Sequence, residues 1–233
     1  MSLLGNTVLV NWGGIVASKE NEYNQWHSIE HMPERISLNG FLRGCRAVGL
    51  PGTDVNHKYF MMYEADRKEV FTSKKYLERL NNPTKWTKDI LSNYISPSRT
   101  ICSVIASKSI GFGGFFSTIR FLDKNIDDKH NVETLKLSVP QTIKLQGVTG
   151  MHVLLGDDTF GQMKTEEKTF RSSQGMVDQV ISQAIIIEGL NFEALSNAVN
   201  SLEKEHLFLE NDNLLINYYC CQHVLTKQDL LGI

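Results

Sequence analysis

The stretch Pro33-Glu34-Arg35-Ile36-Ser37-Leu38-Asn39-Gly40 occurs twice in outline. It returns 107 residues later, with 33 becoming 140, as Pro140-Gln141-Thr142-Ile143-Lys144-Leu145-Gln146-Gly147. An apolar residue follows the glycine each time, so the shared pattern is P-x-x-I-x-L-x-G-apolar. An internal repeat of this kind decides how the rest of a chain is interpreted. The pattern therefore predicts two related halves.

The regions on either side of the two motifs have the same order of expected elements, because a helix precedes each motif and apolar runs surround it. In the first half we expect strands at 7–16, 41–49, 58–64 and 100–107, helices at 20–37 and 68–80, and a short helical turn through Trp86 and Ile90. In the second half we expect strands at 115–122, 148–155, 183–188 and 215–224, and helices at 132–145 and 192–204. The polar stretch 156–178 is expected to be a mobile insertion.

Each half therefore has the order βαββαβ, which is typical of a ferredoxin-like unit with both helices on one face of a four-stranded antiparallel sheet. We predict a first repeat at 1–109, a Gly-rich joint at 110–113 and a second, diverged repeat at 114–233. The bare sheet faces would pack together as an α+β barrel with an interior cavity. The pattern leaves open whether this barrel forms within one chain or across a homodimer.

Composition sets limits on the partners. The 233 residues contain 24 basic and 26 acidic side chains, a formal charge of −2, which gives no reason to expect a nucleic-acid partner. The N-terminus lacks a basic, then apolar, signal sequence, and no apolar run has the length of a membrane span. Cys45, Cys102, Cys220 and Cys221 are read as free thiols in a reducing compartment. We expect a cytoplasmic globular protein without a membrane partner.

The first helix carries a cluster of titratable side chains. His27 and His31 are four residues apart and share a helix face, with Glu30 beside them and Arg35 one turn further on. Pro33 is expected to kink or end the helix just before it. His31 would then lie near a helix C-terminus, where the dipole raises its basicity. Two histidines with a carboxylate can act as a general acid/base pair or hold an anionic or carbonyl substrate.

The second half serves as an internal control for this cluster. The scaffold residues Pro, Ile, Leu and Gly persist there, whereas the titratable positions do not. Thr134, Leu137, Ser138, Gln141 and Thr142 stand where the first half has His27, Glu30, His31, Glu34 and Arg35. A purely structural role would be expected in both halves, so the difference favours function. Solvated or core-satisfied histidines remain the alternative.

Further candidates lie on the neighbouring strands and on the same helix. Arg43 and Arg46 are three apart in a strand and so on opposite faces, with Phe41 and Cys45 on the side of Arg43. Arg46 is therefore the better candidate for reaching a cavity, although solvated edge arginines remain the alternative. Asn11, in an otherwise apolar strand, could line a pocket. Tyr23 and Trp26 are expected to form core or cavity wall.

At these residues the chain resembles the dimeric α+β barrel superfamily, and its EthD-like branch in particular. The resemblance rests on Tyr23-x-x-Trp26-His27-x-x-Glu30-His31-x-Pro33-Glu34-Arg35 followed by Gly40-Phe41-x-Arg43-Gly44, and most of it lies between 8 and 49. It implies a site centred on His31, with Pro33 and Gly40 as scaffold. Members of the superfamily include small-molecule isomerases, cofactor-free monooxygenases and haem-binding proteins. The second half matches only in outline and lacks the histidine.

Three other interpretations remain open. His27-Ser28-Ile29-Glu30-His31 matches the H-x-x-E-H pattern of zinc peptidases, in which two helical imidazoles bind the metal. Those enzymes need a further acidic ligand downstream, and no Asp or Glu occurs between Asp89 and Asp123, where it should fall. Haem bound through His31 is conceivable. A non-catalytic protein that binds a small ligand, or only dimerises, is the third.

The interpretation adopted is a cofactor-independent small-molecule enzyme of EthD-like type. His31 is expected to transfer the proton, His27 and Glu30 to tune or orient it, and Arg35 or Arg46 to hold a negative charge of the substrate. Tyr23, Trp26 and Asn11 complete the predicted binding residues. The chemistry could be proton transfer, isomerisation or a monooxygenase-like reaction.

Overall fold

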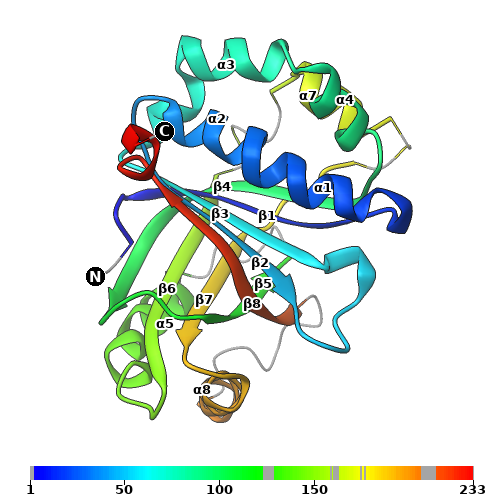
Figure 1. The fold of residues 1–233 in the computed structure, drawn as a ribbon. Coiled ribbons are helices and arrows are strands. Elements are labelled where there is room, and N and C mark those ends of the chain that lie inside the picture. Colours follow the sequence, from blue (N-terminus) through cyan, green and yellow to red (C-terminus); the bar gives the residue numbers. More distant parts are fainter. Residues whose placement is uncertain are drawn as a thin grey trace.

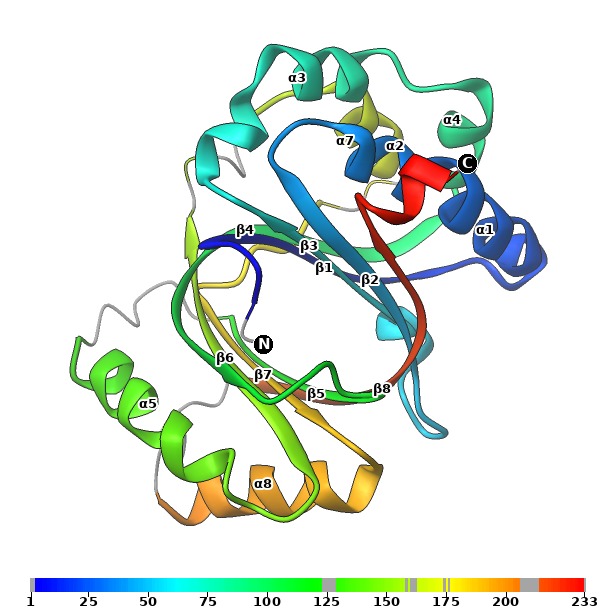
Figure 2. The same ribbon diagram turned by 60° about the vertical axis from the view of Figure 1, so that its left-hand side comes forward.

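The computed structural model describes residues 3–122, 129–157, 159, 163–173, 175, 177–205 and 214–232. Its centre is a closed antiparallel barrel with the strand order β1-β3-β2-β8-β5-β7-β6-β4 (Figures 1 and 2). The strands are β1 (Thr7–Ile15), β2 (Phe41–Gly49), β3 (Tyr59–Ala65), β4 (Tyr94–Ser109), β5 (Phe115–Phe121), β6 (Val148–Asp157), β7 (Gln183–Gly189) and β8 (Leu214–Thr226). The prediction of an α+β barrel is confirmed.

Helices cover the barrel in two separate layers (Figure 2). One layer lies over the strands of the first half, and the other lies over those of the second. The helices are α1 (Glu20–Trp26), α2 (Met32–Ser37), α3 (Lys74–Asn81), α4 (Lys85–Leu91), α5 (Lys129–Thr142), α7 (Glu166–Arg171) and α8 (Phe192–Lys204). The helix α7 follows β6 in the chain but packs on α3 and α4, in the layer of the first half.

The barrel closes within a single chain. The first half contributes the neighbouring strands β4-β1-β3-β2, and the second contributes β8-β5-β7-β6. Antiparallel pairing of β2 with β8, and of β4 with β6, joins these two sheets along both edges. Each barrel strand therefore has two partners, and a homodimer is not required to close the ring.

The interior of the barrel is filled by side chains, so the expected interior cavity is wrong. Alternate residues of β1 and β3 point inward, and Trp12 stacks on Phe60 there with ring centroids 5.3 Å apart. On β7, Ile186 points inward and Ile185 points to the second helix layer, and both are fully buried. Burial of both faces explains why these strands are apolar almost throughout rather than alternating.

A bulge in β2 changes which side chains share a face. The register between β2 and β3 shifts between Phe41 and Arg43. Phe41 consequently packs under the first helix layer, whereas Arg43 and Cys45 point into the barrel. The expectation that Phe41 shares a face with Arg43 and Cys45 is therefore wrong. Arg43 Nε donates to Glu64 Oε1 at 2.5 Å, a buried pair inside the barrel.

The repeated glycines occupy the same kind of turn in both halves. Gly40 has a φ of 91° and Gly147 has a φ of 79°, in the left-handed region that glycine adopts without strain. In each turn the first strand residue donates to the leucine three residues back, Phe41 to Leu38 and Val148 to Leu145. The conformation of the backbone explains why the pattern keeps a glycine at this point.

Two further elements differ from the sequence-based expectation. β4 begins at Tyr94 instead of residue 100, since this strand runs on to pair with the end of β1. The stretch 156–178 was expected to be an irregular, mobile insertion, but it contains α7, which begins after Thr165. The Thr165 side chain caps that helix by accepting from the backbone N–H of Lys168. Residues 158, 160–162, 174 and 176 lie outside the described residues.

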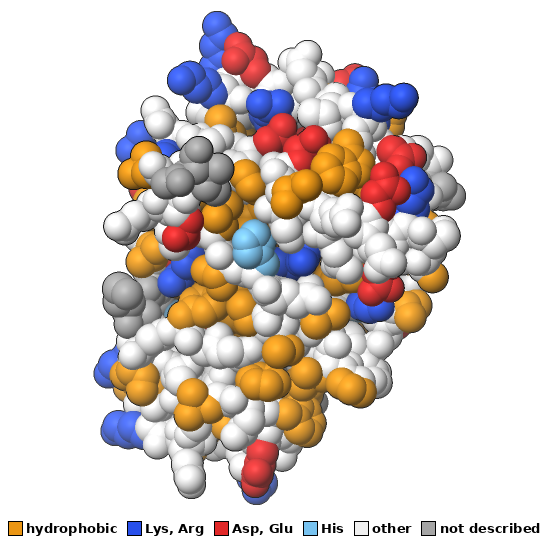
Figure 3. Space-filling model, viewed as in Figure 1, with side chains coloured by type: hydrophobic (Ala, Val, Ile, Leu, Met, Phe, Trp, Pro, Cys, Tyr) orange, Lys and Arg blue, Asp and Glu red, His pale blue; other side chains and the backbone are white. Residues whose placement is uncertain are grey.

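The surface shows no segregation of charge on the face drawn in Figure 3. Basic and acidic side chains are interspersed over the first helix layer, and hydrophobic side chains lie among polar ones below it. Within the described ranges, no helix has both the length and the apolar character needed to cross a membrane.

The filled interior makes a testable prediction. Ile185→Ala and Ile186→Ala should each lower the free energy of unfolding by about 2–5 kcal/mol, since each leaves a cavity in a packed core. Ile110, which is 76% exposed, is the matched control, and Ile110→Ala should change stability by less than about 0.5 kcal/mol. Urea unfolding measures all three. A negligible cost for Ile186→Ala alone would mean that the barrel interior is loosely filled.

Candidate functional site

The helical segment that carries the histidines is continuous from α1 to α2 and contains one π-helical turn, His27–His31. The backbone N–H of Met32 donates to the carbonyl of His27, five residues back. The wider turn gives the ring of Pro33 room that a regular α-turn denies it, so the helix passes the proline and ends at Ser37. Of the two outcomes expected at Pro33, a kink or an end, the helix does not end there, and it reaches the last residue of the predicted helix 20–37. Such turns occur often at functional sites.

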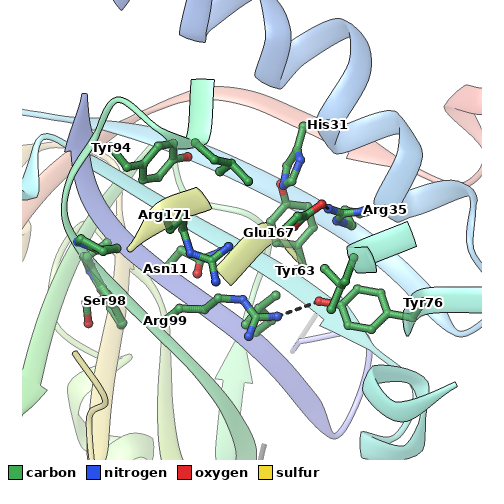
Figure 4. A pocket seen from close by; sticks show the side chains of 15 residues that line it. Asn11, His31, Arg35, Tyr63, Tyr76, Tyr94, Ser98, Arg99, Glu167 and Arg171 are labelled. Atoms are coloured by element: carbon green, nitrogen blue, oxygen red, sulfur yellow. Dashed lines mark hydrogen bonds and ion pairs between the residues drawn. The ribbon is translucent and has the colours of Figure 1, made fainter. Parts of the chain in front are cut away.

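The π-turn brings the two imidazoles together on the face that meets the sheet. The ring centroids of His27 and His31 are 5.6 Å apart, and His31 lies against Trp26 at 4.4 Å. Nε2 of His27 is 3.0 Å from the hydroxyl of Tyr63 on β3, in a fully buried hydrogen bond. His31 is partly exposed and points from its helix toward Tyr63 and the space beside it (Figure 4).

Glu30 points away from the imidazoles and anchors the π-turn to α4. Its Oε1 accepts from Thr84 Oγ1 at 2.6 Å and from Thr87 Oγ1 at 3.0 Å. Thr84 is also the N-cap of α4, and Thr87 accepts a hydrogen bond from Trp26 Nε1. The geometry thus gives Glu30 a structural connection, distinct from the tuning role that the sequence suggested.

A pocket lies between the first helix layer and the outer face of β1, β3 and β4 (Figure 4). It is therefore outside the barrel, contrary to the prediction of an interior site. Its polar lining residues are Asn11, His31, Arg35, Tyr63, Tyr76, Tyr94, Ser98, Arg99, Glu167 and Arg171. The free volume is about 40 Å³, room for only a few water molecules. The pocket is consequently closed around its lining in this structure.

Three arginines surround the space that His31 faces. Arg35 of α2 is buried and forms an ion pair with Glu167 of α7. Arg171, also on α7, makes a two-pronged contact with Asp178 at 2.9 and 3.2 Å. Arg99 of β4 donates to the hydroxyl of Tyr76 at 2.7 Å. The pocket is therefore rich in positive charge.

This environment keeps both histidines neutral. Burial, and then the charge of Arg35, hold the pKa of His31 well below its usual value of 6.5. Burial, and then Arg46, do the same for the pKa of His27. The expectation that a helix dipole would raise the basicity of His31 is wrong, because His31 lies within a continuous helix and among cations. Burial works against the charge of Arg35, but the carboxylate of Glu167 outweighs it and raises the pKa of Arg35.

The predicted binding residues fall into two groups. Asn11, His31 and Arg35 line the pocket. Tyr23, Trp26 and Arg46 form the wall behind His27, where Arg46 donates to the carbonyl of Asn24 and lies over the ring of Tyr23.

Sequence reasoning missed several lining residues. Tyr63 was taken as part of an ordinary strand, although it pairs with Leu9 and so shares a face with Asn11 on β1. Arg99 lies directly opposite Asn11 on β4, but the predicted strand began one residue after it. The spacing of Glu167 and Arg171, four apart after a threonine N-cap, was a helical signal in the stretch expected to be irregular. Nothing in the sequence indicated which helix layer α7 would join.

The geometry gives little support to a metal centre here. His27 already bonds Tyr63, and Glu30 bonds two threonines, so the H-x-x-E-H residues do not converge on one point. Among the residues that the structure places, no group of three or more His, Cys, Asp or Glu is arranged to hold a metal ion. A pocket of about 40 Å³ also has no room for haem beside His31.

The fold is shared with solved structures at low sequence identity. An anthrone oxidase-like protein superposes with a TM-score of 0.59 at 11% identity, over 97% of this chain and 96% of that one. A protein from Fusobacterium nucleatum assigned as a monooxygenase gives 0.58 at 10% identity, over 97% and 96%. A haem-binding protein from Thermus thermophilus gives 0.51 at 9% identity, over 100% and 96%. No family model and no curated protein sequence matches the chain.

These neighbours belong to the dimeric α+β barrel superfamily, and this chain has their fold. At such identities the likeness establishes the architecture alone. The chain is thus an α+β barrel protein with a polar pocket on the outer face of its first sheet.

The neutral histidines predict a pH dependence of stability. Below about pH 6.5 the unfolded chain binds a proton at His27 that the folded chain does not, so the free energy of unfolding should fall as the pH is lowered. The limit is about 1.4 kcal/mol per pH unit for one histidine. Urea unfolding at about pH 7 and pH 5 should show a smaller difference for His27→Gln than for wild type. The exposed Ile29→Ala should keep the wild-type dependence, and an unchanged dependence in His27→Gln would contradict the assignment.

Proposed function

We propose that this protein is a cofactor-independent enzyme that removes a proton from an acidic C–H or O–H group of a small molecule, with His31 as the base. The observation that carries the proposal is the neutral imidazole of His31 facing a closed pocket that also holds Arg35, Arg99 and Arg171. A base must be unprotonated to act, and the three cations could stabilise the anion that it creates.

The lining residues can both accept the proton and stabilise the anion that remains. His31 would accept the proton, leaving an imidazolium and a substrate enolate or phenolate. Arg35 and Arg99, together with the hydroxyls of Tyr63 and Tyr76, would then provide positive charge and hydrogen-bond donors where the negative charge develops. Closing the pocket excludes water, which strengthens these interactions.

Other residues of the cluster would act by positioning. His27 holds Tyr63 through a buried hydrogen bond, and Glu30 ties the π-turn to α4. Arg46 would contribute by helping to keep His27 neutral, without touching the substrate.

The names of the structural neighbours support this class of chemistry. They include an anthrone oxidase-like protein and proteins assigned as monooxygenases. If this chain acts on such a substrate, deprotonation would be the first step, and molecular oxygen would then oxidise the anion. Conversion of a CH₂ group to a carbonyl by O₂ places one oxygen atom in the product and the other in water.

We further propose an EthD-like relationship and an origin by tandem duplication, with repeats at 1–109 and 114–233 and a joint at 110–113. The equal strand order of the two halves supports it, as do the matching glycine turns at Gly40 and Gly147. Only the first repeat would retain a site, because the second has no histidine at the position of His31.

The direct test uses anthrone as a probe in D₂O without oxygen. Wild type should accelerate exchange of the methylene protons, followed by NMR, and His31→Gln should reduce this acceleration by about 10²–10⁴-fold, the usual contribution of a general base. Ile29→Ala changes a solvent-facing residue of the same π-turn and should leave the rate unchanged. If wild type accelerates exchange of neither anthrone nor a series of enolisable ketones and phenols, the protein is a ligand-binding protein instead.

The pH profile of the same reaction gives an independent prediction. The rate should stay level from about pH 8 down to about 6.5 and decline only below that, because His31 must lose its proton to act and its pKa is depressed. Removing a nearby cation should raise that pKa, so Arg35→Met should move the acid limb to higher pH. If the acid limb of the rate profile does not move in Arg35→Met, the essential base is a group other than His31.

A further inference from the structure

The pocket has a charge imbalance that its own residues do not resolve. Arg35, Arg99 and Arg171 line it, and Glu167 is the only carboxylate among its described lining residues. Arg171 is already matched by Asp178 in a two-pronged ion pair. Glu167 matches Arg35, which leaves Arg99 with the neutral hydroxyl of Tyr76 as its hydrogen-bond partner. Asp178 also interacts electrostatically with Arg99, so the three arginines share the carboxylates of Glu167 and Asp178.

Arg35 is engaged on one side only. Its Nη2 contacts Oε1 of Glu167, whereas Nη1 donates no hydrogen bond and has Glu34 Oε2 at 3.9 Å. The guanidinium is 3% exposed, so water does not readily satisfy the free N–H groups. A planar carboxylate is the group that fills both Nη positions of an arginine at once. Nδ1 of His31 is a second buried polar atom without a partner. Each of these two atoms needs a hydrogen-bond partner, which a ligand in the pocket could supply.

Glu167 is suited to give up this position. It belongs to α7, a helix of six residues that reaches the site from the second half. Outside the pocket, the described contacts of α7 include Glu166 N–H to Asn81 Oδ1 at 3.2 Å and Lys88 over the ring of Phe170. With Glu167 in place, the remaining volume of about 40 Å³ cannot accept a molecule as large as a benzene ring. A substrate of that size therefore requires a lining side chain to move, and Glu167 on the short helix α7 is a candidate.

We propose that the substrate is a carboxylate, and that its carboxylate replaces Glu167 on Arg35 with Arg99 supplying the second positive charge. Glu167 acts as an internal stand-in for that group when the pocket is empty. The inference rests on the proposed function only in that it concerns the same pocket, and binding can be measured without turnover. Figure 4 shows the side chains of Arg35, His31 and Arg99 around the same pocket, so the rest of a molecule held at Arg35 would lie close to His31 and Arg99.

The test compares carboxylates with their uncharged amides as probes. Acetate, benzoate and 1-naphthoate, each paired with its amide, are titrated by calorimetry at about pH 7. Benzoate or naphthoate should bind wild type at least about tenfold more tightly than the amide, a difference of about 1.4 kcal/mol. Glu167→Gln keeps the shape but removes the competing charge, and should tighten carboxylate binding by about tenfold or more. Arg35→Lys keeps the charge but loses the two-pronged donor, and should weaken carboxylate binding about tenfold with little effect on amides.

The controls separate this inference from the proposed enzyme. Arg67→Lys changes an exposed arginine that is not among the pocket's lining residues and should bind as wild type does. Melting curves establish that each variant is folded. If no carboxylate binds better than its amide in wild type and in Glu167→Gln, or if Glu167→Gln leaves carboxylate affinity unchanged, the inference is overturned. If His31→Gln retains carboxylate binding while wild type and this variant are equally inactive in proton exchange, the carboxylate site stands and the proposed reaction falls.

Discussion

Closure of eight strands into one ring is the constraint on which the rest of the structure depends. Two four-stranded sheets each have two free edges, and an unpaired edge exposes backbone donors and acceptors. Pairing β2 with β8 and β4 with β6 removes all of these edges within a single chain. Once the ring is closed and its centre filled, the only faces left for helices are on the outside. The pocket is therefore found in a helix layer instead of the barrel interior.

Each helix layer covers the outer face of one four-stranded sheet, but the two layers differ in the polarity of that contact. Over the second sheet, α5 and α8 bury an apolar face, and the cluster around Leu135 and Leu195 has no polar pocket among its members. Over the first sheet, the π-turn redirects two imidazoles, and α7 adds a third polar wall from the other half of the chain. Burial among arginines then holds the pKa of His31 low, so that layer combines a base with positive charge.

Much of the architecture could be predicted from local pattern. The periods of apolar residues located the barrel strands to within a few residues, apart from the early start of β4, and the P-x-x-I-x-L-x-G motif identified the turns at Gly40 and Gly147. The site was predicted only in part. His31 and Arg35 were found because they are close in sequence, and Asn11 because a polar residue interrupts an apolar strand.

The features that could not be predicted from the sequence have physical explanations. A proline within a helix normally predicts a break, and only the observed π-turn shows how the chain avoids it. The bulge in β2 reverses the alternation of faces between Phe41 and Arg43, which no pattern of period two can anticipate. Glu167 is 132 residues from Arg35, so their ion pair is a product of the fold alone. The sign of the pKa shift of His31 likewise depends on neighbours that come from distant segments.

Because α7 comes from the second half, the two halves of the chain contribute different parts of the pocket. A segment inserted between β6 and β7 can vary in length and composition without disturbing the strands that border it, since only its ends are fixed by the sheet. The half that lacks a counterpart of His27 and His31 thus supplies one wall of a pocket built mainly by the other. Changes in that segment could alter the pocket while the helix that carries His31 stays as it is. The halves are consequently inseparable in a functional sense, and two copies of the first alone would form a ring whose pockets lack α7.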